Sequence, residues 1–187
     1  MGSITIRKTI ASDLPLLSAI ETAAHEPYRA IGMADFAEQK LPTLEELEAY
    51  HDTGHAWVAA VPKDKEDAGT PIAFVLVYVV NNDGLGWKSV FIHEISVSPE
   101  YARRGIGKTL IDHVASWARQ SGARALDLAT YVNVPWCKPY FERLGFQVAD
   151  EEELLLNEYS GVRRLIMCEW NDELLGRWRR VAMRRLL

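Results

Sequence analysis

Cysteine is scarce in this chain, and basic residues do not outnumber acidic ones. Two cysteines, Cys137 and Cys168, occur among 187 residues. Two are too few for a disulfide framework or a four-thiolate zinc site, and they favour a reducing compartment. The formal net charge is -5, whereas proteins that mainly bind nucleic acid are normally basic. The composition therefore predicts neither a disulfide scaffold nor a nucleic-acid-binding protein.

Long apolar segments are also missing. No run approaches the roughly 18 residues of a membrane span, and the start of the chain has no apolar signal region. Hydrophobic residues make up 48% and charged residues 25% of the sequence, which is an ordinary composition for one globular domain. We therefore expect a cytoplasmic protein without a membrane span.

Hydrophobic periodicity predicts a mixed α/β (α+β) chain built around one sheet. Strands are expected near residues 4–9 and at 56–61, 72–80, 89–97, 125–131, 146–149 and 163–170. Helices are expected from Leu14 to about His25, from Thr43 to about Tyr50, and at 105–121 and 135–144. Turns are expected at 62–70 and 81–84, where charged residues or Asn-Asp-Gly chemistry dominate.

The end of the chain is unusually rich in arginine. Five arginines lie between Arg177 and Arg185, and Leu174, Trp178 and Val181 share one helical stripe. This pattern predicts a domain over residues 1–170, followed by a basic amphipathic helix over residues 171–187. We expect that helix to pack on its own domain or on a homodimer partner, with contact to a membrane surface or to nucleic acid as the alternatives.

A basic turn containing glycine lies between the strand that ends at Val97 and the helix that follows. It reads Arg103-Arg104-Gly105-Ile106-Gly107-Lys108-Thr109. Free amide hydrogens and a partial positive charge at a helix N-terminus attract phosphate, and glycines let the backbone approach a ligand. The turn is therefore predicted to bind a phosphate-bearing ligand.

Two common phosphate motifs do not fit this turn. A Walker A loop needs glycine at the position of Ala102, and a dinucleotide-binding fingerprint needs glycine at the position of Leu110. The remaining pattern, Arg-x-Gly-x-Gly after a strand and Val-x-Pro, resembles the acetyl-CoA pyrophosphate loop of the GNAT superfamily of N-acyltransferases.

Two other segments carry the same resemblance. Asn133–Phe146 is similar to the late helix of the superfamily, which typically ends Phe-Tyr-Glu-x-Leu-Gly-Phe. Tyr28-Arg29-Ala30-Ile31-Gly32-Met33, which precedes a Pro-x-Leu-Glu-Glu helix, is similar to one of its subgroups. The resemblance therefore spans about Ile4 to Trp170.

The resemblance implies a mostly antiparallel mixed sheet with a central, splayed pair of parallel strands, flanked by helices. Acetyl-CoA would lie between these strands and pair with the backbone of Ile95 and Val97, with its pyrophosphate on the Arg103–Lys108 turn. Other implied cofactor-binding residues are Ser96, Thr109, Asn133 and Phe141. The implied activity is direct acetyl transfer from acetyl-CoA to a primary amine of a small molecule or peptide, without a metal ion.

Acetylation of an amine requires a base, because an alkyl ammonium has a pKa near 10. Glu94 occupies a position where family members often carry a carboxylate, so it is predicted to act as the general base, directly or through a water molecule. Two alternatives are that Glu94 anchors the substrate ammonium or that it pairs with a nearby arginine. His93 points to the opposite strand face and is interpreted as a packed or hydrogen-bonded residue.

The group that protonates the CoA thiolate is less clear from the pattern. The family usually places a tyrosine where this chain has Phe141. We predict Tyr140 as the acid, with Tyr131 and water as the alternatives. Cys137 has no histidine close in sequence and is interpreted as a small, partly buried residue.

The end of the first helix lines the acceptor site in related proteins, and here it contains Glu21, His25, Glu26 and Tyr28. Glu26 and Tyr28, together with Glu94, are predicted to bind a substrate amine, and carboxylates there would suit a cationic one. The alternative is that this region is a solvated helix end. Two other functions stay open. The chain could be a CoA-binding sensor or pseudoenzyme, or an interaction protein that acts through its basic C-terminal helix.

Overall fold

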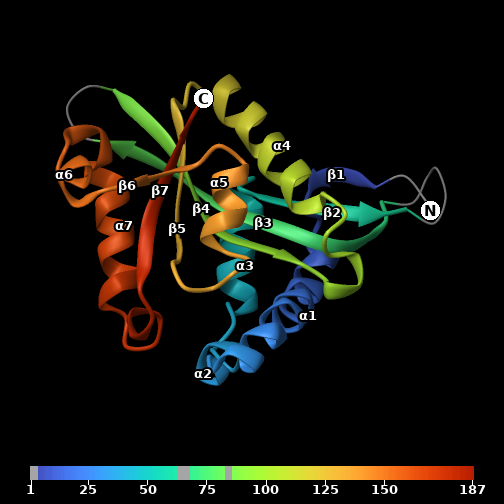
Figure 1. Cartoon of the computed structure of the whole chain (residues 1–187). Helices are drawn as coiled ribbons and strands as arrows, with labels where there is room; N and C mark the ends of the chain where they lie inside the picture. The colour runs from blue at the N-terminus through green and yellow to red at the C-terminus, as the bar shows by residue number, and fades with distance from the viewer. Residues whose placement is uncertain (1–3, 63–67, 83–85) are drawn as a thin grey trace. The chain divides into compact units, whose positions relative to one another are not determined.

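The computed structural model describes residues 4–62, 68–82 and 86–187 (Figure 1). Its strands are β1 (Thr5–Lys8), β2 (Ala56–Val61), β3 (Thr70–Asn82), β4 (Trp87–Val97), β5 (Ala125–Tyr131), β6 (Gln147–Ala149) and β7 (Arg180–Leu186). Its helices are α1 (Leu14–His25), α2 (Ala34–Ala37), α3 (Leu44–Asp52), α4 (Ile106–Gln120), α5 (Lys138–Arg143), α6 (Glu151–Leu154) and α7 (Ser160–Asn171). Residues 63–67 and 83–84, which belong to the two expected turns, lie outside the described residues.

The described strands form a seven-stranded sheet in the order β1-β2-β3-β4-β5-β7-β6. β4 and β5 are parallel, whereas β1–β2, β2–β3, β5–β7 and β6–β7 are antiparallel. The parallel ladder joins Ser89–Phe91 to Ala125–Asp127, and β4 continues six residues further, to Val97. This arrangement confirms the mixed sheet with a parallel pair that the family resemblance implies.

The chain packs as two compact units, and the first comprises residues 1–77 and 94–114. Alternation along β2 sends Val58 and its neighbours of the same parity into a core with α1 and α3. That core contains Leu14, Leu17, Ile20, Leu47, Tyr50, Ala56, Val58, Ala60, Phe74 and Leu76. Trp57 has the opposite parity, and its ring lies 6.1 Å from that of His113 on α4. The strands of this unit are thus covered by helices on both faces.

The second unit comprises residues 78–93 and 115–187. Helix α7 buries one face of its strands in a core of Val80, Phe91, Ala149, Leu154, Tyr159, Val162, Ile166 and Ala182. Figure 1 shows α7 running beside β7. Together, α6 and α7 occupy the connection between the neighbouring strands β6 and β7.

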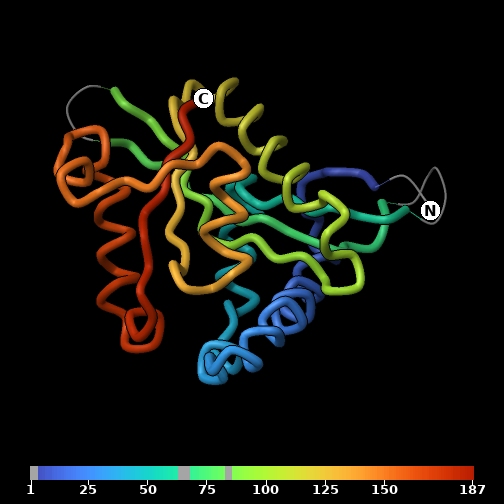
Figure 2. The backbone as a smooth tube through the Cα atoms, in the orientation of Figure 1, coloured from blue at the N-terminus to red at the C-terminus, as the bar shows by residue number. Residues whose placement is uncertain are grey.

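The predictions for the C-terminal region were wrong in two places. Residues 163–170, expected as a strand, lie within helix α7, and residues 171–187, expected as a helix, contain strand β7. Figure 2 traces β7 in red. Ala182, Met183 and Arg184 are all buried, although they alternate between the two faces of the strand. The strand therefore has no exposed polar face at these positions, because β5 pairs along its whole length and β6 pairs with Ala182–Arg184.

Three of the five arginines of this segment stabilise the second unit from within. Arg180 pairs with Glu169 at 2.6 Å, and Arg184 pairs with Asp127 at 2.6 Å. Arg185 donates a hydrogen bond to the Leu144 carbonyl at 3.1 Å. Because these contacts are internal, the proposal of an interaction protein acting through a basic helix loses its structural basis.

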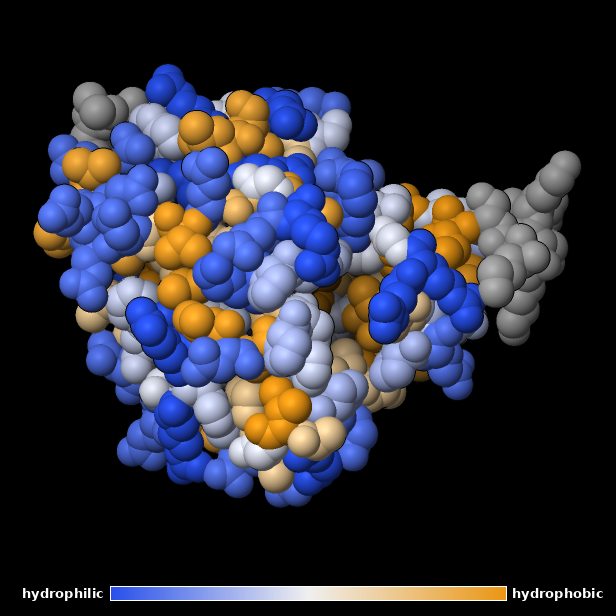
Figure 3. All heavy atoms as spheres, in the orientation of Figure 1, coloured by the Kyte–Doolittle hydropathy of each residue, from blue (hydrophilic) through white to orange (hydrophobic). Residues whose placement is uncertain are grey.

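The helices of the described residues give no indication of a membrane span. Among residues 4–62, 68–82 and 86–187, none of the helices combines the length and the apolar character needed to cross a bilayer. On the face shown in Figure 3, hydrophobic residues form separate patches among hydrophilic ones.

Candidate active site

Glu94 lies on β4 in the first unit, where it is half-buried. The Ser96 hydroxyl donates a hydrogen bond of 2.7 Å to Glu94 Oε1, so the two side chains share one strand face, as their parity predicts. Because Ser96 is buried, its hydroxyl restrains the carboxylate. His93 is exposed, and its ring lies 5.2 Å from that of Tyr78.

Helix α1 brings two further titratable side chains to Glu94. Glu21 and His25 lie one helical turn apart, and each is only 4% exposed. One carboxylate oxygen of Glu21, one of Glu94 and one ring nitrogen of His25 all lie within 4.8 Å of one another. We call these three residues the acidic cluster. Its ligand atoms are close enough together to hold a single cation.

The surroundings of His25 fix its ring. Gln39 Nε2 lies 3.5 Å from His25 Nδ1, and the Phe36 ring lies 4.7 Å from the histidine ring. Burial lowers the pKa of His25 to about 4, because a buried imidazolium loses its hydration. The ring is therefore neutral at pH 7.

Burial also controls the charge of Glu21. Loss of hydration, and then the nearby charge of Glu94, raise the pKa of Glu21 from 4.5 to about 8. Glu21 is therefore mostly protonated at neutral pH. The arrangement leaves Glu94 as the carboxylate that can bind an ammonium group and accept a proton from it.

Glu21→Gln is expected to stabilise the protein in a pH-dependent way. Above pH 4.5 the unfolded chain ionises Glu21, whereas the native state keeps this proton until about pH 8. The native state therefore binds more protons in this window, and the free energy of unfolding falls as pH rises. A neutral glutamine removes this penalty, so urea unfolding should show a gain on the order of 4 kcal/mol at pH 8 and less than about 1 kcal/mol at pH 5.

Glu26→Gln serves as the control for that measurement. The Glu26 carboxylate is exposed and accepts a hydrogen bond from Arg29 Nε at 3.1 Å. Its substitution should change the free energy of unfolding by less than about 0.5 kcal/mol, with little pH dependence. An equal effect of Glu21→Gln at both pH values would contradict a buried, protonated Glu21.

Glu26 and Tyr28, the two residues predicted to bind the acceptor, both belong to the 3-10 helix Glu26–Ile31, but only Tyr28 lies beside the acidic cluster. The ring of Tyr28 lies 4.6 Å from Phe36 and 6.0 Å from His25, so it borders the acidic cluster. The Glu26 carboxylate is not part of the cluster. Instead, Glu21 supplies the second carboxylate.

The sequence carried a signal for Glu21 and His25. Both residues continue the helical stripe of Leu14 and Leu17, which are buried. Polar residues on a buried stripe are unfavourable unless they have a partner or a function. The partner, Glu94, is more than 60 residues away in the chain, so the stripe alone did not reveal the cluster.

The basic turn that is predicted to bind phosphate comprises residues 103–108, and we call it the phosphate-binding turn. It lies in the same unit, between a 3-10 helix (Pro99–Tyr101) and α4. Arg103 and Gly105 have positive φ angles of 61° and 80°. The first helical hydrogen bond runs from Thr109 N to Gly105 O at 2.9 Å. The amides of Ile106, Gly107 and Lys108 therefore precede the first hydrogen bond of the helix, where amide groups are free to bind a ligand.

Cationic side chains surround these amides. Arg103, Arg104 and Lys108 are exposed. Arg104 donates a hydrogen bond to the Glu100 carbonyl at 2.9 Å, and Lys108 pairs with Asp112 at 2.5 Å. The space beside Gly105 is open, since no atom would lie within 4 Å of a Cβ there. The turn therefore fits a pyrophosphate group.

The predicted residues of the late helix lie in the second unit. Asn133 is exposed after β5, whereas Tyr140 and Phe141 on α5 are half-buried, with their rings 5.2 Å apart. Tyr131 is buried, and burial raises its pKa to about 12, so it is a poor proton donor. Cys137 is buried, which agrees with its interpretation as a packing residue. Tyr140 stays the predicted acid.

Comparison with known proteins gives a match over most of the chain. The model of the acetyltransferase (GNAT) family matches residues 17–146. An uncharacterized N-acetyltransferase of Methanocaldococcus jannaschii is 34% identical over 74 residues, which cover 40% of this chain and 31% of that protein. The mycothiol acetyltransferase of Propionibacterium freudenreichii is 26% identical over 142 residues, which cover 75% of this chain and 42% of that protein. The chain thus matches less than half the length of either relative.

Solved structures share the fold. The ribosomal-protein-S18-alanine N-acetyltransferase of Escherichia coli superposes with a TM-score of 0.64 at 18% identity, over 98% of this chain and 94% of that one. The PaiA N-acetyltransferase of Thermoplasma acidophilum, solved with coenzyme A, gives 0.63 at 18% identity over 99% of both chains. Identities this low establish similarity of fold alone.

Proposed function

Because the chain belongs to the GNAT family of acetyltransferases, we propose that it transfers the acetyl group of acetyl-CoA directly to a primary amine, with Glu94 as the general base. The amine would belong to a small molecule or a peptide. The observation that carries this proposal is the acidic cluster, in which a half-buried carboxylate lies beside a protonated carboxyl group and a neutral imidazole.

The acetyl-CoA part of the proposal rests on the phosphate-binding turn and on β4. The amides of Ile106, Gly107 and Lys108, with the exposed arginines beside them, would hold the pyrophosphate. β4 extends from Ile92 to Val97 beyond its last pair with β5. The backbone of Ile95 and Val97 would pair with the pantetheine arm, and the amide near Ile95 would polarise the thioester carbonyl.

The reaction conserves charge and protons. Glu94 takes a proton from the ammonium, and the amine nitrogen then attacks the thioester carbon. A C–N bond forms and the C–S bond breaks, so the CoA thiolate leaves and takes a proton from Tyr140 or water. The new amide nitrogen loses its remaining extra proton to solvent, so each turnover releases one proton overall. Because the cluster is anionic, we expect cationic amines to be preferred.

An amine panel tests this function. The protein is incubated with acetyl-CoA and with polyamines, amino acids, aminoglycosides or peptides, and the release of free CoA thiol is measured. We expect thiol release that depends on a primary amine, and mass spectrometry should show the acetylated product. Tight acetyl-CoA binding in isothermal titration without any acetylated product would favour the CoA-binding sensor instead.

Gly105→Ala is expected to weaken acetyl-CoA binding. The substitution places a Cβ at a position with φ of 80° and in the open space beside the turn, where the pyrophosphate is proposed to bind. The expected result is a rise of about tenfold in the KM for acetyl-CoA with a nearly unchanged kcat, because strain and obstruction together cost about 1–2 kcal/mol. Initial-rate kinetics measure both constants.

Gly122→Ala is the matched control, because Gly122 follows the other end of α4. It has nearly the same φ, 79°, and the same open space for a Cβ. This variant should lose similar stability but keep the KM for acetyl-CoA. If both variants change that KM equally, backbone strain explains the effect and the turn is not the pyrophosphate site.

A further inference from the structure

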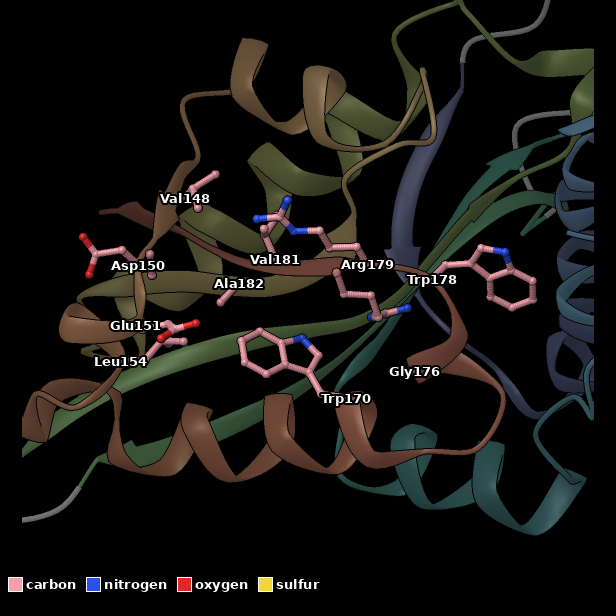
Figure 4. A pocket seen from close by; sticks show the side chains of 12 residues that line it. Val148, Asp150, Glu151, Leu154, Trp170, Gly176, Trp178, Arg179, Val181 and Ala182 are labelled. Carbon is pink, nitrogen blue, oxygen red and sulfur yellow. The ribbon is translucent and has the colours of Figure 1, made fainter. Parts of the chain in front are cut away.

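The second unit contains a cavity of about 470 Å³ that the proposed reaction does not use. It lies beside β7, β6, α6 and α7, as Figure 4 shows. Its walls include the apolar side chains of Val148, Leu154 and Val181 and the rings of Trp170 and Trp178. The volume is within the range of pockets that bind small ligands or short peptides.

One wall of the cavity is a strand edge. β5 pairs with β7 from Arg180 to Leu186, but β6 pairs only with Ala182–Arg184. β6 ends at Ala149, and the chain then turns into α6. On this side of β7, Arg180 and Val181 therefore lie beyond the end of β6, and both line the cavity.

One hydrogen bond shows which side of β7 the backbone N–H and C=O of Arg180 face. Val132 N donates to Arg179 O at 3.0 Å, so the backbone of Arg179 faces the β5 side. Backbone groups alternate along a strand, and the N–H and C=O of Arg180 must therefore face the β6 side. These groups are oriented to pair with a further strand in line with β6.

Two buried side-chain donors also lack an acceptor. Trp170 Nε1 and Arg180 Nε have no hydrogen-bond partner among the described residues. The indole ring of Trp170 extends from α7 toward β7 (Figure 4). Buried donors are normally satisfied, and an unsatisfied one is unfavourable. A ligand with acceptor oxygens would complete them.

The charges around the cavity favour a neutral acceptor over an anion. The Arg180 guanidinium is already paired with Glu169 at 2.6 Å. Of the other charged residues that line the cavity, Asp150 and Glu151 are acidic and Arg179 is basic, so the remaining charge is negative and disfavours a carboxylate ligand. Backbone carbonyl groups of a peptide are neutral acceptors that recur along an extended chain.

We propose that this cavity binds an extended peptide segment, which adds to the open edge of β7 in line with β6. The peptide backbone pairs with Arg180, and one of its carbonyl oxygens accepts the indole N–H of Trp170. Alternate side chains of the peptide pack on the apolar wall, as in other cases of strand addition. This binding does not depend on acetyl transfer.

Nuclear magnetic resonance of the tryptophan indole N–H groups tests the proposal on the whole chain. The probe is the blocked tetrapeptide acetyl-Thr-Val-Thr-Val-amide, and Trp170→Phe assigns the Trp170 signal. The tetrapeptide should shift that signal in a saturable way at about 1 mM or below. The same peptide with N-methylated valines keeps its side chains but loses two backbone donors, so it should bind about tenfold more weakly.

One variant tests the indole N–H of Trp170 as a hydrogen-bond donor, and a second variant is its control. Trp170→Phe keeps an aromatic ring but removes the N–H, and peptide affinity measured by titration calorimetry should fall about fivefold. Trp136→Phe changes an exposed tryptophan outside the cavity and should leave affinity unchanged. Circular dichroism checks that both variants fold.

Three results would overturn the proposal. The first is no shift of the Trp170 signal at about 1 mM peptide, which would exclude even weak binding. The second is equal affinity for the N-methylated and unmodified peptides, which would exclude strand addition. The third is tighter binding of a small carboxylate, such as phenylacetate, which would identify an anion site instead.

Discussion

Glu94→Gln is expected to lower kcat by about 10²- to 10³-fold, because a general base typically contributes a factor of this size. Glutamine has nearly the same shape and can still accept the Ser96 hydrogen bond of 2.7 Å. It cannot take a proton from an ammonium group. The KM for acetyl-CoA should change little, since its pyrophosphate is assigned to the amides and arginines of the phosphate-binding turn.

The pH dependence of the defect gives a sharper test. Each pH unit below the pKa of the amine, near 10, reduces the free-base fraction about tenfold. The variant depends on amine that is already deprotonated, so its kcat/KM should rise about tenfold per pH unit. The wild-type enzyme should have a flatter profile. The ratio of the two rates should therefore shrink toward pH 10.

The same experiment distinguishes the other roles of Glu94. If Glu94 only anchors the ammonium, the KM for the amine rises and kcat is retained. If it is structural, stability falls and the remaining folded enzyme keeps its rate. Ser96→Ala is the companion variant, since loss of the restraining hydrogen bond should lower kcat by a smaller factor without altering the pH profile. An unchanged kcat in Glu94→Gln would exclude the general-base role.

Asp127→Asn is expected to destabilise the protein by about 3–5 kcal/mol. Asp127 and Arg184 face each other across β5 and β7, and their side chains are only 1% and 5% exposed. Two hydrogen bonds of 2.6 and 3.1 Å join them. Burial raises the pKa of Asp127, and Arg184 opposes this shift. An asparagine would leave the buried guanidinium with only the more exposed Glu158 carboxylate, at 3.8 Å, as a counter-charge.

This loss would be large relative to the stability of a typical domain, which is about 5–15 kcal/mol. The Arg184 guanidinium also lies 3.4 Å from the centre of the Tyr159 ring, so its displacement would disturb the core around α7. Urea unfolding followed by circular dichroism measures the effect. The double variant Asp127→Leu with Arg184→Met should recover much of the loss, because an apolar pair can replace a buried ion pair.

Glu142→Gln provides the matched control for a surface pair. Glu142 pairs with Lys138 on α5, and both side chains are considerably more exposed than those of the buried pair. Its loss should cost no more than about 0.5 kcal/mol. Similar effects of Asp127→Asn and Glu142→Gln would mean that the buried pair is not essential to the second unit.

The local elements of the fold could be predicted because their signals are local. The capping box at Thr43 forms with Glu46 as its spacing indicates, and the boundaries of β5 match the expected range, Ala125–Tyr131. The turn at Gly105 starts α4 as predicted. In each case, neighbouring residues supply the hydrogen bonds or the alternation that fix the structure.

The C-terminal segment shows where that approach fails. Leu174, Trp178 and Val181 have helical spacing, yet Arg180–Leu186 form strand β7, which lies between β5 and β6 in the sheet. Isolated arginines on a segment indicate solvent exposure, but Arg184 is buried because Asp127 lies opposite it on β5. The pairing partner, and not the periodicity, determines this strand.

By itself, the sequence determined the family resemblance, most of the local elements and the position of the glycine-containing basic turn, because each depends on residues close together in the chain. Tertiary structure decided which carboxyl group joins Glu94. Packing of α1 selects Glu21 over Glu26, since only the buried stripe of that helix reaches β4. The same packing removes water from Glu21, and the resulting rise in its pKa exists only in the folded chain.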